Sequence, residues 1–412
     1  MVLPIALRHL TRDAWLLFVT RFIRLFAYGS LSVVLVFYLV GVGLSEPQIG
    51  MLLTLTLVGD TLVSLYLTTR ADRIGRNRAL VAGALLMAAA GIAFSSTGNF
   101  WFLVVAGTIG VISPSGNEVG PFLSIEQAAL TSVVTDRNRT AVFAWYSLIG
   151  SVATALGALA GGWISRYLQV TSMAPLGSYR TIVILYGVLG LTLAALFSRL
   201  SRAAETTSPA QRNILGLGRS RDVVVKLSAL FALDSFGGGF VIQSFAAYWF
   251  YLRFGVNPGT LGAIFFWANI FAGISALLAS RLAARFGLIR TMVGTHLPSN
   301  VLLIMVPLMP TLPLAVLVLL IRFSISQMDV PTRQSYVMAV VSPEERSAAA
   351  GITGIARTIG AAISPLFVGL MFARPALINL PFFIAGTLKI AYDLLLYREF
   401  VAVRPPEERE QT

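Results

Sequence analysis

The sequence contains no cysteine, which excludes disulfides, thiolate catalysis and cysteine-ligated metal. Its two histidines, His9 and His296, are too few and too far apart along the chain to predict a metal site. Charge is also scarce: 12% of the 412 residues are charged, against roughly 25% in a soluble domain. So few charged side chains cannot cover a water-facing surface, which excludes an ordinary soluble fold. We expect no metal, no cofactor and no catalytic residues.

Apolar residues are abundant instead: they make up 56% of the chain and fall into long blocks. Blocks of about 20 apolar residues match the thickness of a bilayer core, whereas a β-barrel would show alternating segments of about ten residues. The sequence therefore predicts an all-α membrane protein. Twelve spans are expected at about residues 14–40, 48–69, 79–96, 101–134, 142–165, 181–198, 224–252, 259–280, 291–309, 313–341, 347–372 and 376–397.

The net charge of +13 is explained by where the basic residues lie. Alternate connections, beginning with the N-terminus, carry 21 Lys and Arg when Lys226 at the start of the seventh span is included, whereas the connections on the other side carry four. Basic loops are retained in the cytoplasm, so both termini are predicted to be cytoplasmic, in an inner or plasma membrane. No nucleic-acid partner is needed to account for the charge.

The chain divides into two halves that resemble each other. Gly43 and Gly50 in the first half correspond to Gly255 and Gly262 in the second, each 212 residues further along. Duplication of this kind is usual in secondary transporters, whose substrate site lies between the repeats near the bilayer midplane. The expected domains are a six-helix bundle at 1–198, a polar cytoplasmic linker at 199–223 and a six-helix bundle at 224–412.

The fourth span contains a segment that is poorly suited to a helix. Residues 110–122, GVISPSGNEVGPF, include two prolines and three glycines. Proline removes a backbone donor and glycine weakens a helix, so we predict a break here. Breaks at membrane depth persist where they line a cavity or are buried in protein. The alternative is a kinked helix with ordinary packing glycines.

The stretch TTRADRIGRNR, from Thr68 to Arg78, resembles the loop signature of the major facilitator superfamily between the second and third spans. That signature reads roughly G-x-L-A-D-R-x-G-R-R, and here Thr68 and Arg70 replace its leading Gly and its Leu. The resemblance extends over the chain in topology and duplication, and it implies two pseudo-symmetric six-helix bundles. It also implies a cytoplasmic gating latch, formed by Asp72, Arg73, Gly75 and Arg76. Alternatively, the loop anchors the chain to lipid headgroups.

A weaker resemblance lies in the fifth span. Antiporters of this family often carry G-P-x-x-G-G there, and this sequence has GALAGG, from Gly157 to Gly162, with Ala158 in place of the Pro. Small residues also allow close helix packing in any membrane bundle. The segment therefore favours an exporter without deciding the direction.

Several charged side chains fall inside the predicted spans, where charge is costly and is by default paired, exposed to water or functional. In the family that the sequence resembles, spans 1, 4, 7 and 10 line the central cavity. The expected substrate cavity comprises Arg24, Asp60, Asn117, Glu118, Glu126, Asp234, Arg333 and Arg357. Lys389 and Asp393, near the cytoplasmic end of the last span, are expected to snorkel or to pair locally.

The duplication places Glu126 and Arg333 at equivalent positions of spans 4 and 10, 207 residues apart. Burial and a nearby arginine act in opposite senses on the proton affinity of a carboxyl group, so an acid there could load and release a proton. We predict that Glu126 does so, with Arg24 or Arg333 as its alternating partner. Asp234 and Asp329 are the competing proton-coupling residues. The alternative for Glu126 is a static salt bridge that orders the bundle.

These features favour a secondary active transporter that exports a small organic solute in exchange for protons by alternating access. The alternative is proton-linked uptake of an anionic or sugar-like metabolite. The acids and aromatics of the spans suit a cationic solute. The arginines of the spans, Arg24, Arg322, Arg333 and Arg357, suit an anion instead.

Other classes fit less well. No G-x-x-x-x-G-K-[ST] loop occurs, which disfavours an ATP-driven pump. An enzyme would need a catalytic constellation that this composition does not suggest, and a channel suits the loop motif and interlocked charges less well than a carrier. We expect a monomer whose partners are a small-molecule substrate, protons and the lipid bilayer.

Asp72→Asn is expected to slow transport while leaving substrate binding largely intact, because a latch acts on the conformational step rather than on the cavity. Turnover and binding are to be measured on the same reconstituted preparation. Wild-type turnover in the variant would remove Asp72 from the latch.

Overall fold

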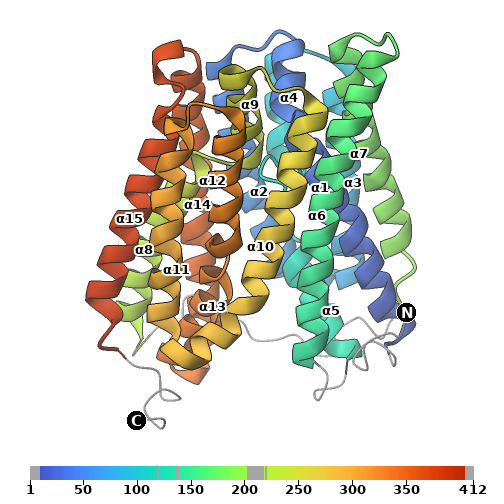
Figure 1. Cartoon of the computed structure of the whole chain (residues 1–412). Coiled ribbons are helices and arrows are strands. Elements are labelled where there is room, and N and C mark those ends of the chain that lie inside the picture. The colour runs from blue at the N-terminus through green and yellow to red at the C-terminus, as the bar shows by residue number, and fades with distance from the viewer. Residues whose placement is uncertain (1–9, 119, 135–138, 202–217, 219, 404–412) are drawn as a thin grey trace, which may run out of the picture. The chain divides into compact units, whose positions relative to one another are not determined.

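The computed structural model describes residues 10–118, 120–134, 139–201, 218 and 220–403, without the side chains of residues 72, 139–141, 343 and 347. Every regular element in these ranges is a helix (Figure 1). The all-α prediction is therefore confirmed.

The helices fall into two compact units, 1–210 with 243–266 and 211–242 with 267–412. The first unit contains α1 (Arg12–Gly41), α2 (Glu46–Ile74), α3 (Arg76–Ser96), α4 (Phe100–Ile109), α5 (Phe122–Val133), α6 (Arg139–Val170), α7 (Pro175–Phe197) and α9 (Gln243–Phe254). The second contains α8 (Arg221–Gly239), α11 (Leu288–Met305), α12 (Leu312–Ser326), α13 (Asp329–Val340), α14 (Arg346–Phe372) and α15 (Leu380–Phe400). Helix α10 (Pro258–Phe286) begins in the first unit and ends in the second. The bundle boundaries predicted around residues 199–223 stay predictions.

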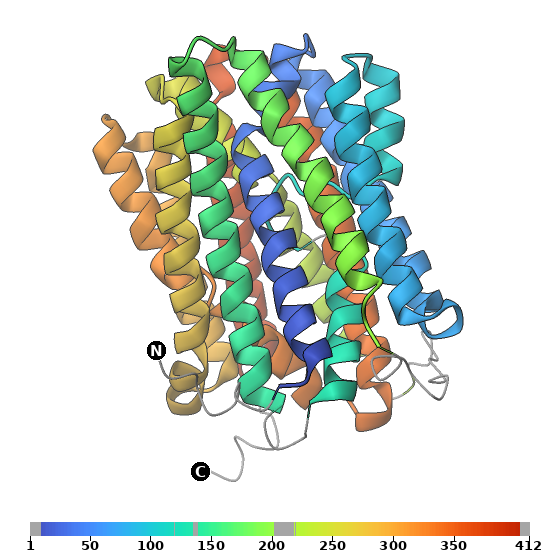
Figure 2. The same cartoon turned by 90° about the vertical axis from the view of Figure 1, so that its right-hand side faces the viewer.

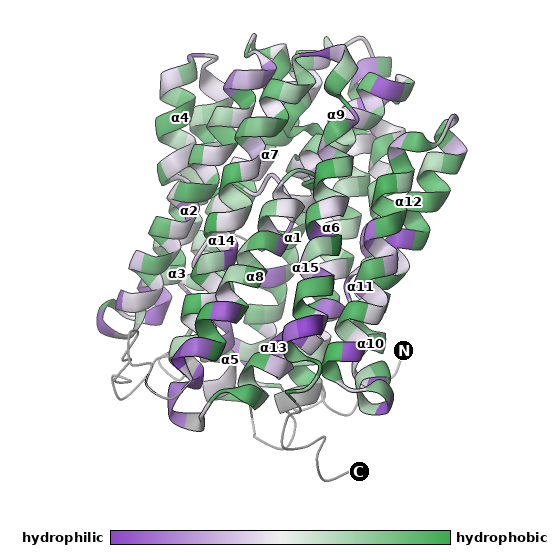
Figure 3. Cartoon of the chain, turned by 90° about the vertical axis from the view of Figure 1, so that its left-hand side faces the viewer, coloured by the Kyte–Doolittle hydropathy of each residue, from purple (hydrophilic) through white to green (hydrophobic). Residues whose placement is uncertain are grey.

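The described residues contain eleven stretches long and apolar enough to cross a membrane, and the short apolar helix α4 begins one more. Two of the eleven, Arg221–Phe254 and Leu312–Val340, each join two consecutive α-helices. Helices α4 and α5 together make up the predicted fourth span. Hydrophobic residues cover most of the ribbons (Figure 3). The twelve-span membrane architecture expected from the sequence is confirmed.

Local sequence signals set several helix starts. The Thr11 hydroxyl accepts a hydrogen bond from the backbone N–H of Ala14 at 3.2 Å, and the Asn99 side chain accepts one from that of Phe102 at 3.1 Å. A side-chain acceptor at this position satisfies one of the donors that a helix N-terminus leaves unpaired. Such caps fix where α1 and α4 begin.

Glycines let helices of the first unit approach closely. Helix α6 lies against α1 (Figure 2). A Cβ atom added at Gly157 or Gly161 of α6 would collide with the backbone of Phe26 or Ser30 of α1. Gly157 and Gly161 belong to the GALAGG segment noted in the sequence. Small residues that allow backbone contact are the usual means of association in a bilayer, where no hydrophobic force drives helices together.

The predicted break in the fourth span is confirmed. The described residues between α4 and α5 are not helical, and Gly116 and Gly120 there have φ of 71° and 78°. Positive φ is readily adopted by glycine and strained for other residues. Two further breaks were not predicted: residues 240–242 separate α8 from α9, and residues 327–328 separate α12 from α13.

Gly360→Ala is expected to lower the thermal unfolding midpoint, because the new methyl group would collide with the Ala232 carbonyl where α14 packs on α8. Overpacking of this kind costs about 1–3 kcal/mol. Gly354, in the same helix, has nothing within 4 Å of an added Cβ. Gly354→Ala is the matched control and should leave the midpoint unchanged or raise it. Equal effects of the two substitutions in detergent would contradict the close packing at Gly360.

Candidate functional site

The first unit holds a buried ion pair between α1 and α5. Arg24 Nη1 donates to Glu126 Oε1 at 2.6 Å, and Arg24 Nη2 donates to Glu126 Oε2 at 2.8 Å. Both side chains are 0% exposed. The hydroxyl of Tyr146 on α6 donates to Glu126 as well, and that of Thr20 does so at 3.4 Å. Two-point arginine–carboxylate contacts are strong and geometrically specific, so Glu126 is firmly held in this conformation.

Arg24 also contacts a second acid, Glu118, in the non-helical segment of the fourth span. Its Nη2 lies 3.1 Å from Glu118 Oε2 and 3.2 Å from Glu118 Oε1. Arg21, one turn earlier on α1, donates to the same carboxylate. Positions three apart share a helix face, which is why both arginines reach Glu118. One arginine therefore joins two acids, and the break in the span places the second of them.

Two backbone carbonyls in this break accept hydrogen bonds from residues of other helices. The hydroxyl of Tyr186 on α7 donates to the Val111 carbonyl at 2.7 Å. The backbone N–H of Ser244 on α9 donates to the Pro114 carbonyl at 3.1 Å, and the Ser244 hydroxyl donates to it too. Backbone polar groups at membrane depth have to be satisfied within the protein, and these bonds do so for the segment that carries Glu118.

Two predicted cavity residues of the first unit stand outside the ion pairs. Asn117 is exposed. Its backbone carbonyl accepts a hydrogen bond from Ser113 Oγ at 2.7 Å, and its backbone N–H donates one to Ser115 Oγ at 3.3 Å. Asp60 on α2 is 7% exposed, and its Oδ1 has no hydrogen-bond partner in the part of the chain that the structure describes. Its electrostatic neighbours include Tyr28 and Tyr186. Asp60 is thus a buried acid, and the ion pairs of Arg21 and Arg24 are made with Glu118 and Glu126 instead.

The second unit holds a larger network centred on Asp234 of α8. Lys389 Nζ of α15 donates to Asp234 Oδ1 at 2.6 Å, and Arg333 Nη1 of α13 donates to Asp234 Oδ2 at 3.0 Å. Arg333 Nη1 also lies 3.1 Å from Asp329 Oδ2. All three predicted proton-coupling acids are therefore paired with arginine: Glu126 with Arg24, and Asp234 and Asp329 with Arg333. Of the two alternatives expected for Lys389, snorkelling and pairing, the structure shows pairing: the residue is 8% exposed and its ammonium group is bound to Asp234.

Sequence reasoning missed two members of this network, His296 and Asn300. His296 Nδ1 lies 2.8 Å from Asp393 Oδ1, and Asn300 Nδ2 donates to Asp393 Oδ2 at 3.0 Å. His296 Nε2 is 3.7 Å from Asp234 Oδ1. Asp393 is 1% exposed and paired, so it does not snorkel either. The spacing of four between two polar residues of α11 puts them on one helix face, and that signal was available in the sequence.

The structure describes part of the predicted gating loop. Gly75, with φ of 103°, ends α2 and precedes α3. Arg76 Nη1 donates to the Ala128 carbonyl at 3.1 Å and to Ser132 Oγ at 3.0 Å, which ties the start of α3 to α5. Arg73 is exposed, and the side chain of Asp72 lies outside the described residues. The latch stays a prediction.

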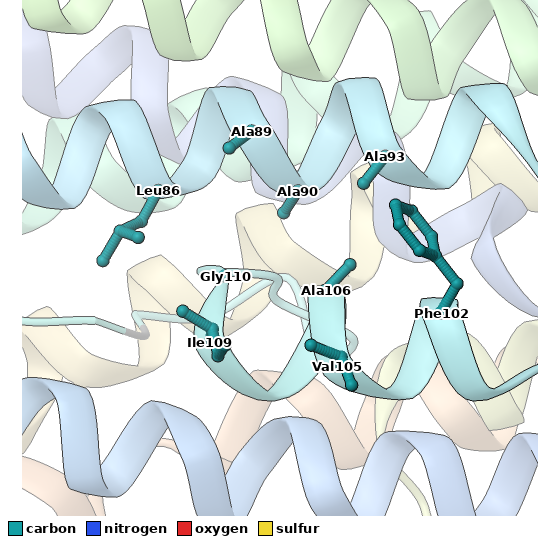
Figure 4. A pocket seen from close by; sticks show the side chains of 9 residues that line it. All are labelled: Leu86, Ala89, Ala90, Ala93, Phe102, Val105, Ala106, Ile109 and Gly110. Carbon is teal, nitrogen blue, oxygen red and sulfur yellow. The ribbon is translucent and has the colours of Figure 1, made fainter.

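An apolar cavity of about 200 Å³ lies elsewhere in the first unit, between α3 and α4. It is lined by Leu86, Ala89, Ala90, Ala93, Phe102, Val105, Ala106, Ile109 and Gly110 (Figure 4). None of these residues carries a charge or a side-chain hydrogen-bonding group. This cavity is therefore distinct from the charged clusters and is not the candidate site.

Comparison with known proteins places this chain among transporters. The sequence matches the family model of the Major Facilitator Superfamily over residues 17–365 and 227–412. It is 31% identical over 426 residues to the uncharacterized membrane protein YJR124C of Saccharomyces cerevisiae, with 95% of each chain covered. The match to the yeast protein therefore extends over nearly the full length of both chains.

Solved structures share the fold. The nucleoside transporter NupG has a TM-score of 0.74 at 14% identity, covering 95% of this chain and 99% of that one. The D-xylose-proton symporter has a TM-score of 0.71 at 14% identity, covering 93% and 97%. A bacterial homolog of the human lysosomal transporter Spinster has a TM-score of 0.71 at 15% identity, covering 95% and 97%. At these identities the likeness is one of fold alone.

Replacing Gly116 and Gly120 together by Ala is expected to impair transport, because both residues have positive φ in the segment that presents Glu118. A left-handed conformation costs a non-glycine residue roughly 1–2 kcal/mol. Gly43 also has positive φ, at 97°, with nothing within 4 Å of an added Cβ. Gly43→Ala is the control that carries the same strain outside the cluster. Initial transport rates per folded protein test this, and an equal loss in the control would assign the effect to strain alone.

Proposed function

Because the chain belongs to the major facilitator superfamily and is a secondary transporter, we propose that it exports a small organic solute in exchange for protons by alternating access. The observation that carries the proposal is the sharing of Arg24 between Glu118 and Glu126. We further propose that the protein works as a monomer with both termini in the cytoplasm.

A shared arginine supports proton coupling for an electrostatic reason. Removing one partner of a buried ion pair usually costs about 3–5 kcal/mol, because the remaining charge is left uncompensated. Here a proton that neutralises Glu126 leaves Arg24 still in contact with Glu118, so the cost is reduced. Loading a proton on Glu126 would thereby loosen the contact between α1 and α5 and strengthen the contact with the segment between α4 and α5. A change of partner of this kind links protonation to conformation.

The glycines of α6 support export as the direction of transport. Gly157 and Gly161 bring α6 into backbone contact with α1, the helix that carries Arg24. The segment is similar to the glycine-rich one of family antiporters, which supports export. Proton-linked uptake is the second candidate, since one structure with the same fold is a D-xylose-proton symporter.

A solute screen on proteoliposomes, with and without a pH gradient, tests the class of activity. Saturable uptake or release that follows the pH gradient is expected of a proton-coupled carrier, and the sign of the gradient that drives it gives the direction. Non-saturable flux would indicate a channel. Saturable transport that is indifferent to pH would refute proton coupling.

Glu126→Gln is expected to abolish pH-driven transport while preserving exchange of the solute across the membrane, because it removes titration with little change of shape. Asp234→Asn and Asp329→Asn are the comparison variants. Glu399, in an exposed ion pair with Lys226, supplies the control Glu399→Gln, which should transport as the wild type does. If Glu126→Gln keeps full pH-driven transport and Asp234→Asn loses it, the coupling acid lies on α8 instead.

A further inference from the structure

Two arginines of the second unit lack an acidic partner among the described residues, although the guanidinium of one, Arg322, lies 5.0 Å from the centre of the Phe323 ring. Arg322 lies on α12 and Arg357 on α14, both within membrane-spanning stretches. The Nε atom of each is shielded from solvent and has no hydrogen-bond partner in the described ranges. Neither side chain forms an ion pair with a described residue. Both residues are partly exposed, and an arginine inside a membrane protein is costly unless water or a negative group reaches it.

The three buried acids of this unit already have other partners. Asp234 is bound by Lys389 and Arg333, and Asp329 by Arg333. Asp393 is bound by His296 and Asn300. Three acids therefore stand among four basic side chains, namely Arg322, Arg333, Arg357 and Lys389. The cluster of the first unit differs, since Arg21 and Arg24 are balanced by Glu118 and Glu126.

Both arginines interact electrostatically with acids of the network centred on Asp234. Arg322 interacts electrostatically with Asp329 and Asp234. For Arg357 the largest charge–charge interaction is with Arg333, a group of the same sign, ahead of those with Asp234 and Asp329. Like charges placed near each other at membrane depth repel strongly. An anion bound beside them would relieve this repulsion.

We propose that Arg322 and Arg357 bind the negatively charged group of the transported solute, which makes that solute a small organic anion with a carboxylate or phosphate group. A guanidinium presents a planar fork of N–H donors that matches both groups. The inference rests on the proposed function only in taking the bound anion to be the transported solute. It does not depend on the direction of transport or on the coupling ion.

Binding is tested on the purified full-length protein in detergent, by thermal shift and by titration. The probes are matched pairs in which one member lacks the charge: succinate with succinamide, and glucose 6-phosphate with glucose. We expect an anionic member to raise the unfolding midpoint and its neutral partner to leave it unchanged. Arg322→Gln and Arg357→Gln should each weaken binding of that anion about tenfold or more, as expected for the loss of a hydrogen-bonded charge pair.

The controls separate binding from folding. Arg290 is exposed on α11, and Arg290→Gln should bind as the wild type does. Without ligand, Arg322→Gln and Arg357→Gln should be at least as stable as the wild type, because the substituted arginines form no ion pair with a described residue. A large loss of stability would indicate a structural role and count against the site. Arg357→Lys keeps the charge and loses the fork, so its affinity should fall between those of wild type and Arg357→Gln.

Each remaining outcome is decisive. Wild-type affinity in both glutamine variants, or equal protection by the neutral probes, would overturn the anion site. Protection by vesicles of phosphatidylglycerol but by neither soluble anion would assign the arginines to a lipid headgroup and overturn the solute assignment. If the anion binds through these arginines but its transport ignores a pH gradient, proton coupling fails and the anion site stands. If a neutral solute is carried on a pH gradient, the anion site fails and proton coupling stands.

Discussion

A charge at membrane depth loses its water and gains nothing from hydrocarbon, so the protein has to supply its partner. In the first unit this requirement is met around Arg24. The side chain is fully buried and held at two points by Glu126. It also contacts Glu118, and its guanidinium lies 4.6 Å from the centre of the Phe122 ring. Glu118 reaches it from a segment that is not helical, between Ile109 and Phe122. The break in the fourth span and the ion pair therefore belong to one arrangement, in which irregular backbone brings an acid to a buried base.

The fold was accessible from the sequence because a bilayer restricts what a chain can do. Long apolar blocks predict spans whatever their partners are, and the prolines and glycines of residues 110–122 predicted the break that the structure shows. The breaks after Gly239 and after Ser326 were missed. Three consecutive glycines at 237–239 signal the first of these. The second has no comparable signal, since Gln327 and Met328 are compatible with a helix.

The candidate site was accessible only in part. The sequence offered Arg24 and Arg333 as partners of Glu126, and the structure pairs Glu126 with Arg24. The position of a residue along a helix does not say which way its side chain turns, so snorkelling and pairing both stayed open for Lys389, which is bound to Asp234. His296 was set aside because it has no second histidine nearby in sequence, yet its partner Asp393 lies 97 residues further along the chain. Contacts between distant helices decide such cases, and no local pattern encodes them.

The bonds between α9 and the broken span have a mechanical consequence. Ser244 is the second residue of α9. Its backbone N–H and its hydroxyl both donate hydrogen bonds to the Pro114 carbonyl. Glu118 stands four residues after Pro114. Any displacement of α9 along its axis would pull on this short length of chain, which has no helical hydrogen bonds to resist extension. The tether would then act as a linkage that converts helix movement into a change in how firmly Glu118 holds Arg21 and Arg24.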